Sequence, residues 1–68
     1  MVRLRVKELV EQRGITWQQF ANDTKLSKQT IYALMTNKIT RLDLKTLDAL
    51  CRYFGVAPAE ILEYRSDE

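Results

Sequence analysis

A chain of 68 residues can form one small domain at most, and such a domain buries only about 60% of the surface that its unfolded chain exposes. Hydrophobic residues make up 46% of the sequence and charged residues 29%, a balance that is typical of a folded domain rather than a disordered segment. With no histidine and a single cysteine, Cys51, the sequence lacks the usual general base and cannot assemble a zinc site, so we expect neither an enzyme nor a cofactor or metal. The lone thiol suits a reducing, intracellular compartment, and no apolar run approaches the roughly 18 residues of a membrane span.

The charge is unevenly distributed, although the net charge is only +2. Residues 24–42 contain four basic side chains and no acidic one, whereas residues 46–68 contain two basic and five acidic side chains. The four basic residues are Lys25, Lys28, Lys38 and Arg41. A cationic segment of this size fits a polyanion such as nucleic acid, and on charge alone it is equally compatible with an ordinary solvated face.

The first expected helix begins at residue 4 or 5 and ends at residue 13. Val6, Leu9 and Val10 have helical spacing, and Gly14 follows at the position of a C-terminal cap. Residues 1–3 precede this pattern, and we expect them to be extended.

Two short helices follow, and each has a clear start signal. Thr16 and Gln19 form the pattern of a capping box for a helix over residues 17–23. Ser27 is expected to cap the next helix, which ends near Met35. Two short helices joined by a turn of about three or four residues are the arrangement of a helix-turn-helix.

The fourth expected helix covers residues 44–54, between the cap residue Asp43 and the terminating Gly55. Its inward stripe is predicted to consist of Leu44, Leu47, Leu50, Cys51 and Phe54.

A fifth helix is predicted from Pro58, which fits a first helical turn, to near Tyr64. Its residues Ile61 and Leu62 are expected to turn inward. No segment is predicted to be a paired strand, so the expected fold class is all-α, a bundle of five short helices.

The segment TWQQFANDTKLSKQTIYALM, residues 16–35, resembles the helix-turn-helix of the lambda-repressor-like (Cro and Xre) DNA-binding family. The positions that carry the match are those where packing requires a particular residue type: Phe20, Ala21, Leu26, Ile31 and Leu34. The resemblance extends from about Val6 to Leu62. It implies one compact lambda-repressor-like domain over residues 1–68, with a core over about residues 4–64.

Two residues depart from the pattern of that family. Lys25 stands in the turn where the family often has glycine, so either Lys25 adopts a left-handed conformation at a cost of roughly 1 kcal/mol, or the turn differs slightly from that of the family. Trp17 stands where the family often has glutamine, which leaves open a phosphate contact by this side chain. Trp17 could serve function, or it could be a partly buried lid over the core.

The resemblance implies that the helix over residues 27–36 enters the major groove of DNA with its N-terminal residues against the base edges. There Lys28 can donate to guanine, Gln29 can pair with adenine, and Ala33 can contact a thymine methyl. The candidate DNA-binding residues, for bases and backbone together, are Thr16, Gln18, Ser27, Lys28, Gln29, Tyr32, Ala33, Thr36, Asn37, Lys38, Thr40 and Arg41. Without the motif, Lys28 and Gln29 would be a solvated polar face and Asn37 a helix C-cap.

The predicted function is therefore sequence-specific binding to double-stranded DNA, as a repressor-like transcriptional regulator in the cytoplasm, of bacterial, phage or plasmid origin. The resemblance implies a homodimer on a palindromic operator, and the surfaces considered for pairing are Val2, Leu4, Val6 and the fifth helix. The alternative is a protein-interaction module, such as an antitoxin-like adaptor, that keeps the fold with weak or no DNA binding. The absence of acidic residues from 24–42 favours the first hypothesis.

Overall fold

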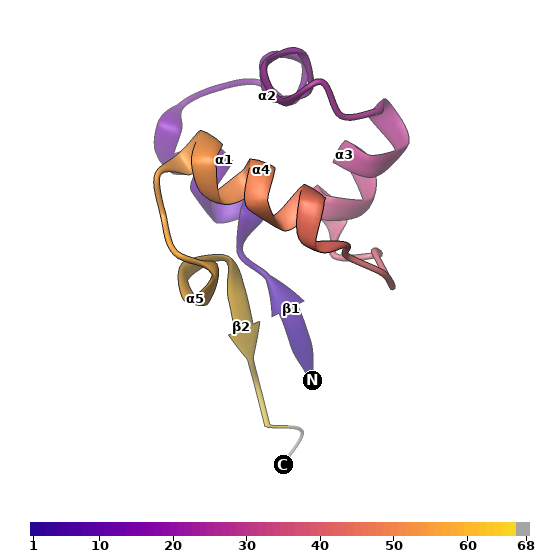
Figure 1. Ribbon diagram of the computed structural model, residues 1–68, viewed down its shortest axis with the longest axis vertical. Helices are drawn as coiled ribbons and strands as arrows, with labels where there is room; N and C mark the ends of the chain where they lie inside the picture. The colour runs from indigo at the N-terminus through magenta and orange to yellow at the C-terminus, as the bar shows by residue number, and fades with distance from the viewer. Residues whose placement is uncertain (67–68) are drawn as a thin grey trace.

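The computed structural model describes residues 1–66, which form a small helical bundle with a two-stranded sheet at one end. The helices are α1 (Val6–Arg13), α2 (Trp17–Thr24), α3 (Lys28–Thr36), α4 (Leu44–Phe54) and α5 (Pro58–Ile61), and the strands are β1 (Val2–Leu4) and β2 (Leu62–Tyr64). Along the longest axis of the molecule, α2 lies at one end and the sheet with the N-terminus at the other (Figure 1). Within residues 1–66, no helix has the length and apolar character that crossing a membrane requires.

The predicted helix caps are confirmed. The side chains of Thr16, Ser27 and Asp43 each accept a hydrogen bond from the backbone N–H three residues later, at 3.0, 3.1 and 2.9 Å. At the other ends of α1 and α4, Gly14 and Gly55 adopt the left-handed conformation, both with φ of 66°. Because these signals act within one helical turn, the observed bounds of α2, α3 and α4 lie within about a residue of those expected from the sequence.

One hydrophobic core joins all five helices to β1. Its buried residues are Leu4, Val6, Val10, Phe20, Ile31, Leu34, Met35, Leu50, Phe54 and Ile61. Phe20 of α2 is fully buried and packs against Phe54 of α4, with 5.5 Å between the ring centroids. This contact packs α2 against α4 and so fixes the position of the helix-turn-helix on the other helices.

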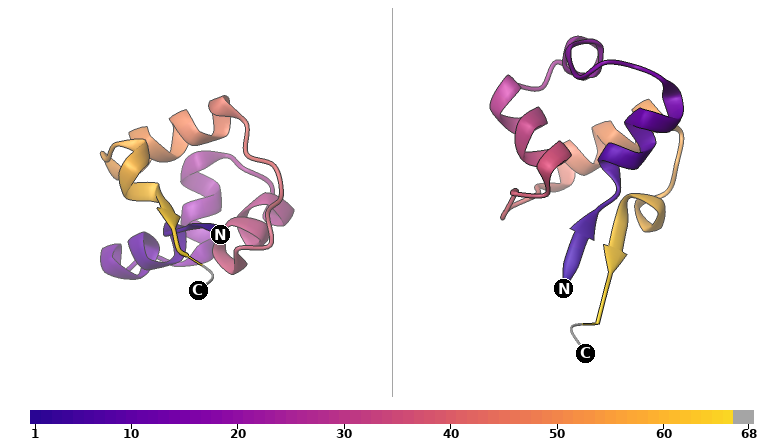
Figure 2. Two further views of the ribbon diagram at one scale, coloured as in Figure 1. Left: turned by 90° about the horizontal axis from the view of Figure 1, so that it is seen from below. Right: turned by 180° about the vertical axis from the view of Figure 1, so that it is seen from behind.

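The prediction that no strand would pair is wrong. β1 and β2 are antiparallel, with Val2 opposite Tyr64 and Leu4 opposite Leu62. The fifth helix ends at Ile61 instead of continuing to near Tyr64, because the backbone becomes extended at Leu62. Figure 2 shows the two strands side by side below the helices. The two halves of this sheet lie about 60 residues apart in the chain, so no local pattern in either half reveals the pairing.

Two leucines expected in the core are exposed. Leu44 has 82% of its surface exposed, because it is the first residue of α4 and the stripe becomes buried only from the second turn of the helix. Leu62 is 37% exposed, because it belongs to β2 rather than to a helix that packs on the core. Ile61 is fully buried, as expected.

The suggestion that Leu4 and Val6 lie in a dimer interface is also wrong. Leu4 is 4% exposed and Val6 0%, and both belong to the core of the single chain. Within β1 the side chains alternate between faces, and Leu4 points into the core. Val2, at the outer end of β1, keeps 65% of its surface exposed.

The predicted domain ends at residue 68, and its last two residues lie outside the described part of the chain.

Candidate nucleic-acid interface

The turn between α2 and α3 depends on a non-glycine residue in the left-handed conformation. Lys25 has φ of 60°, and its backbone N–H donates to the carbonyl of Ala21 at 2.8 Å, which closes the end of α2. Of the two alternatives that the sequence left open, the structure shows the left-handed conformation at Lys25, at a cost of roughly 1 kcal/mol. Ser27 then caps α3 and also donates its hydroxyl to the Thr30 hydroxyl at 2.9 Å. These contacts make a compact connection that sets α3 against α2.

Helix α3 buries one face and exposes the other. Ile31, Leu34 and Met35 lie in the core with 3% or less of their surface exposed. The helical period of 3.6 residues then directs Lys28 and Gln29 to solvent at the first turn, where both are exposed. The N-terminal turn of α3 thus presents two polar side chains suited to read base edges.

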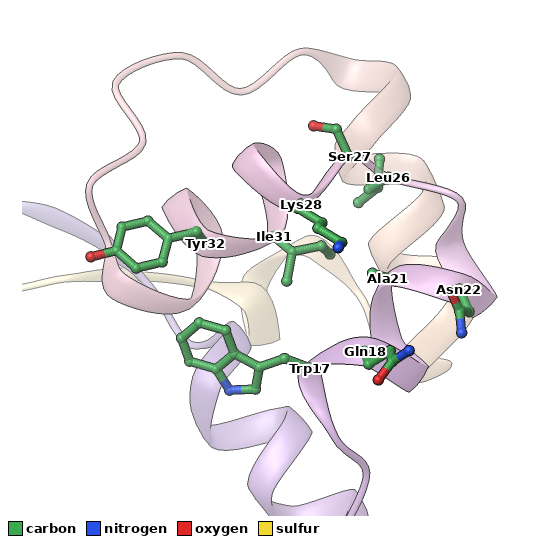
Figure 3. A pocket seen from close by; sticks show the side chains of 9 residues that line it. All are labelled: Trp17, Gln18, Ala21, Asn22, Leu26, Ser27, Lys28, Ile31 and Tyr32. Carbon is green, nitrogen blue, oxygen red and sulfur yellow. The ribbon is translucent and has the colours of Figure 1, made fainter.

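An open groove of about 760 Å³ lies between α2 and α3 (Figure 3). Four predicted site residues line it: Gln18 from α2, Ser27 at the turn, and Lys28 and Tyr32 from α3. Its floor is apolar, formed by Ala21, Leu26 and Ile31. The groove also takes in Trp17 and Asn22, of which Asn22 is absent from the residues expected from the sequence. Nothing in the local pattern distinguishes Asn22 from other polar residues on the surface of α2.

A second, shallower hollow of about 360 Å³ gathers another part of the predicted site. It is lined by Gln29 and Ala33 from α3 and by Lys38, Thr40 and Arg41 from the following loop, together with Thr30 and Ile39. Residues predicted separately as base contacts and as phosphate contacts thus meet at one surface. Lys38 and Arg41 are exposed and are the cations of this surface.

An aromatic pair connects the two helices at the rim of the groove. Trp17 and Tyr32 lie with their ring centroids 6.3 Å apart at an interplanar angle of 61°, an edge-to-face contact. The ammonium nitrogen of Lys38 lies 5.7 Å from the centroid of Tyr32, within the range of a cation–π contact. Trp17 is 43% exposed, so it lies at the rim of the groove rather than sealed over the core.

Two predicted site residues are held by contacts within the chain. The hydroxyl of Thr36 donates to the carbonyl of Tyr32 at 2.7 Å. The side chain of Asn37 accepts from the backbone N–H of Leu4 at 2.6 Å and donates to the carbonyl of Leu4 at 3.0 Å. Asn37 also has φ of 58° at the end of α3, so its alternative role as a helix C-cap is confirmed.

The two acidic residues that flank the basic segment take part in helix packing and capping. Asp23 accepts a hydrogen bond from the hydroxyl of Tyr53 at 2.7 Å, which raises the pKa of that hydroxyl because its neutral form is the donor. Hydrogen bonds from Thr46 lower the pKa of Asp43 because they stabilise its carboxylate. Between these two carboxylates, the charged side chains are the exposed cations Lys25, Lys28, Lys38 and Arg41.

Comparison with known proteins agrees with this geometry. The sequence matches the family model of the Cro/C1-type HTH DNA-binding domain over residues 5–67. The chain belongs to the Cro/C1-type helix-turn-helix family. This Cro/C1-type chain is 38% identical over 66 residues to a protein of Bacillus subtilis (strain 168) named "Uncharacterized HTH-type transcriptional regulator YozG". The match covers 97% of this chain and 66% of the relative, so the chain spans slightly less than two thirds of that protein's length.

No solved structure gives a significant match to this Cro/C1-type chain. The resemblance to the Cro and Xre proteins found in residues 16–35 is confirmed by the family match, and α2 and α3 are its helix-turn-helix. The DNA-contacting role of each side chain stays a prediction.

Proposed function

We propose that this chain binds double-stranded DNA in a sequence-specific manner and acts as a repressor-like transcriptional regulator. The observation that carries the proposal is the exposed first turn of α3, where Lys28 and Gln29 stand free of acidic neighbours in a segment of a Cro/C1-type fold. In this fold class the second helix of the motif enters the major groove, and its N-terminal residues meet the base edges. By occupying a promoter, the protein would then block the transcription machinery or recruit it.

The base contacts are assigned to the outward face of α3. Gln29 would pair with adenine N6 and N7, Lys28 would donate to guanine O6 and N7, and Ala33 would contact a thymine methyl. Each of these side chains belongs to one of the two hollows that flank α3. Tyr32 would pack on the sugar–phosphate backbone, beside the Lys38 ammonium.

The phosphate contacts are assigned to the surfaces on either side of α3. These contacts would orient the domain on the duplex without reading its sequence. The residues assigned to them are Thr16, Gln18, Ser27, Thr36, Asn37, Lys38, Thr40 and Arg41. Of these, Lys38 and Arg41 supply charge, while Asn37 has only its second amide N–H to offer, because the rest of its side chain holds Leu4.

Sequence-specific binding by one short helix reads only a few base pairs, so we propose that the protein works as a homodimer on a palindromic operator. With Leu4 and Val6 buried, the exposed Val2 and the helix α5 remain as the proposed pairing surfaces. We propose that the protein acts in the cytoplasm of a bacterial cell and comes from a bacterial, phage or plasmid gene. The relative from B. subtilis, which is named as a transcriptional regulator, supports this proposal.

The experiment is selection of binding sites from a random pool of DNA duplexes, followed by titration of the selected site at several salt concentrations. An inverted repeat with half-sites about one helical turn apart would support the proposal. If no sequence is enriched, and salt abolishes the weak binding that remains, the protein-interaction module becomes the better hypothesis.

Two variants separate the proposed roles. Gln29→Ala should weaken binding to the selected site by roughly 1–3 kcal/mol and relax the choice of base, because one bidentate contact is lost. Lys38→Ala should weaken binding to all sequences alike and lower the slope of log K against log salt by about one unit. If Gln29→Ala weakens binding equally on every DNA, Gln29 makes no base contact, and an unchanged slope would remove Lys38 from the phosphate contacts.

A further inference from the structure

The outward face of α3 has two flanks, and each flank borders a different hollow of the surface. Lys28 and Ala33 are five residues apart, so their side chains differ by about 140° in direction around the helix axis. Lys28 lines the groove beside α2, whereas Ala33 lines the hollow that it shares with Lys38 and Arg41. An α-helix with its side chains fills the major groove of DNA, which is about 12 Å wide, so a helix bound there has one DNA backbone along each flank.

The charges already assigned to phosphates lie on one flank of α3. Lys38 and Arg41 both line the hollow on the flank away from α2. On the α2 flank, the assigned phosphate contacts Thr16 and Gln18 are uncharged, and Lys28 is assigned to a base. The DNA backbone along this flank carries one negative charge per nucleotide, as the other backbone does, so cations of the protein are expected on this side as well.

A third hollow, of about 470 Å³, continues from the α2 flank. Trp17 lines both the groove beside α2 and this hollow, which also takes in Thr36 and Asn37 at the end of α3. The hollow brings together cations from three segments of the chain: Arg3 of β1, Lys7 of α1 and Arg65, which follows β2. Among the described residues that line it, none is acidic. This cationic hollow therefore adjoins the predicted DNA-binding face.

Lys7 is the cation of this hollow whose charge no neighbour offsets. Arg3 forms ion pairs with Glu8 at 3.0 Å and with Glu63 at 3.4 Å. Arg65 pairs with the same Glu63 at 2.9 Å. Lys7 is exposed and forms no ion pair within residues 1–66. Three cations and two carboxylates leave one positive charge in this cluster, and it is that of Lys7.

The cationic hollow lies too far from the first turn of α3 to share a phosphate with it. Lys28 and Thr36 are the first and last residues of α3, and eight steps of 1.5 Å separate them by about 12 Å along the helix axis. A phosphate bound at the first turn therefore cannot also occupy the hollow. A phosphate in the hollow would be a further one on the same flank.

We propose that the cationic hollow binds a phosphate of the DNA backbone that runs along the α2 flank of α3. Lys7 supplies the charge, and the guanidinium groups of Arg65 and Arg3 supply further hydrogen-bond donors, which suit phosphate oxygens. These residues lie outside the helix-turn-helix, so β1, α1 and the segment after β2 belong to the DNA-binding surface. Such a contact orients the domain without reading the sequence. The inference rests on the proposed function, because it extends the surface that binds DNA.

The first test compares the wild type with Lys7→Ala on the selected duplex at several salt concentrations. Lys7 is exposed in the first turn of α1 and alanine is a good helix former, so the variant should fold. Loss of one phosphate contact lowers the slope of log K against log salt by about 0.9. The affinity of the wild type relative to the variant should therefore fall about three- to fourfold between about 50 and about 200 mM salt. Lys7→Arg keeps the charge and should keep the slope, whereas an unchanged slope in Lys7→Ala overturns the proposal.

Two arginines supply a matched pair of variants. Arg65 and Arg52 are both exposed, and each forms an ion pair with a carboxylate nearby in the sequence, at 2.9 and 3.0 Å. Arg65 lines the cationic hollow, whereas Arg52 on α4 lines none of the three hollows around α3. Arg65→Ala should weaken binding about two- to fourfold at low salt, while Arg52→Ala should bind as the wild type does. Equal losses in both variants would reflect total charge alone and would overturn the assignment of the hollow. Circular dichroism and thermal melting verify that each variant folds.

Neutral methylphosphonates, placed one at a time in the selected duplex, locate the phosphate. The wild type should lose affinity at a phosphate where Lys7→Ala loses none, because the variant has already lost that contact. Substitutions at phosphates that Lys38 contacts should still weaken both proteins. If every methylphosphonate weakens the wild type and Lys7→Ala by the same factor, Lys7 holds no phosphate and the proposal is wrong.

Inorganic phosphate distinguishes a phosphate of DNA from a free anion. Trp17 is the single tryptophan of the chain and lines the hollow, so its fluorescence reports an anion bound there. At constant ionic strength, millimolar inorganic phosphate should leave the fluorescence of the wild type unchanged, since a free phosphate lacks the contacts that the duplex makes elsewhere. A saturating change that Lys7→Ala abolishes, together with an unchanged salt slope on DNA, would assign the hollow to a free anion and overturn the proposal.

The outcomes separate failure of this inference from failure of the proposed function. If selection enriches a site that Lys7→Ala binds as the wild type does, the inference fails and the proposed function stands. If no sequence is enriched, but the weak binding to a random duplex has a lower salt slope in Lys7→Ala, the inference stands and the sequence-specific role fails. A chain that binds no duplex at all refutes both.

Discussion

Asn37 makes two connections at once, and the structure allows their worth to be measured. It ends α3 in the left-handed conformation, with φ of 58°, and its amide binds the N–H and the carbonyl of Leu4, 33 residues away in the chain. A hydrogen bond in a folded protein contributes about 0.5–1.5 kcal/mol net, so the two together should contribute about 1–3 kcal/mol. In a domain of this size, each kcal/mol corresponds to about 4–8 °C in melting temperature.

Asn37→Gly keeps the left-handed backbone without strain and removes both hydrogen bonds. We expect it to lower the free energy of unfolding by about 1–3 kcal/mol at neutral pH. Asn37→Asp is closer in shape: its carboxylate can still accept from the Leu4 N–H, but it faces the Leu4 carbonyl with a second acceptor. We expect a loss of similar size at neutral pH, because two acceptors repel each other.

The pH dependence of Asn37→Asp separates the two bonds. The carbonyl of Leu4 favours the neutral acid, so the folded-state pKa of the introduced carboxyl is raised above its unfolded value. Its protonated form can donate to that carbonyl, and this stabilisation is present at low pH and lost as the pH rises through the raised pKa. Relative to Asn37→Gly, the variant should therefore gain stability on acidification.

The assay is urea denaturation of the wild type and both variants across the acidic and neutral range, followed by circular dichroism. The reasoning is refuted if Asn37→Gly unfolds at the same urea concentration as the wild type, since the amide would then contribute nothing. A constant difference between the two variants at every pH would refute the donor role of the Asn37 amide.

Two further predictions concern helix ends. Lys25→Gly should stabilise the protein by up to about 1 kcal/mol in thermal melting, because it relieves a left-handed non-glycine residue with φ of 60°; its matched control is Gly55→Ala, where a Cβ meets open space but φ is 66°, and which should destabilise by a similar amount. Equal melting temperatures for all three proteins would remove the strain argument. The pKa of Asp43 is lowered from its ordinary value of 3.8, so the carboxylate stabilises the folded state above that value and this contribution is lost as the pH falls through the lowered pKa. Asp43→Asn keeps a capping side chain without the charge, so the stability of the wild type relative to this variant should rise with pH through the acidic range, and a difference that does not change with pH would contradict the assignment.

The helices could be predicted from the sequence because the residues that cap them and set their buried faces act over short distances along the chain. Thr16, Ser27 and Asp43 each bind a backbone N–H three residues away, so a cap and its partner fall within one turn. The buried face of α3 follows from helical spacing in the same way. The family resemblance rested on residues 16–35, and the match over residues 5–67 confirmed it.

The residues of the candidate site could be predicted from the sequence, but their arrangement in space could not. The sequence identified Gln29, Lys38 and Arg41 as candidates separately, and the structure brings them around one hollow beside α3. The sequence left two roles open for Trp17, a functional residue or a partly buried lid over the core. The structure places its ring edge-to-face with that of Tyr32 at the rim of the groove. Such contacts depend on how α2 packs against α3, which side-chain spacing along one helix does not specify.

By itself, the sequence determined the helix-turn-helix, its caps and the cationic character of residues 24–42. Only the tertiary structure decided that β1 pairs with β2 and that Asn37 holds Leu4. The physical reason is the distance along the chain between the residues that interact. Caps and helical faces arise from neighbours within a few residues, whereas the sheet joins segments about 60 residues apart that meet only after the helices have packed around Phe20.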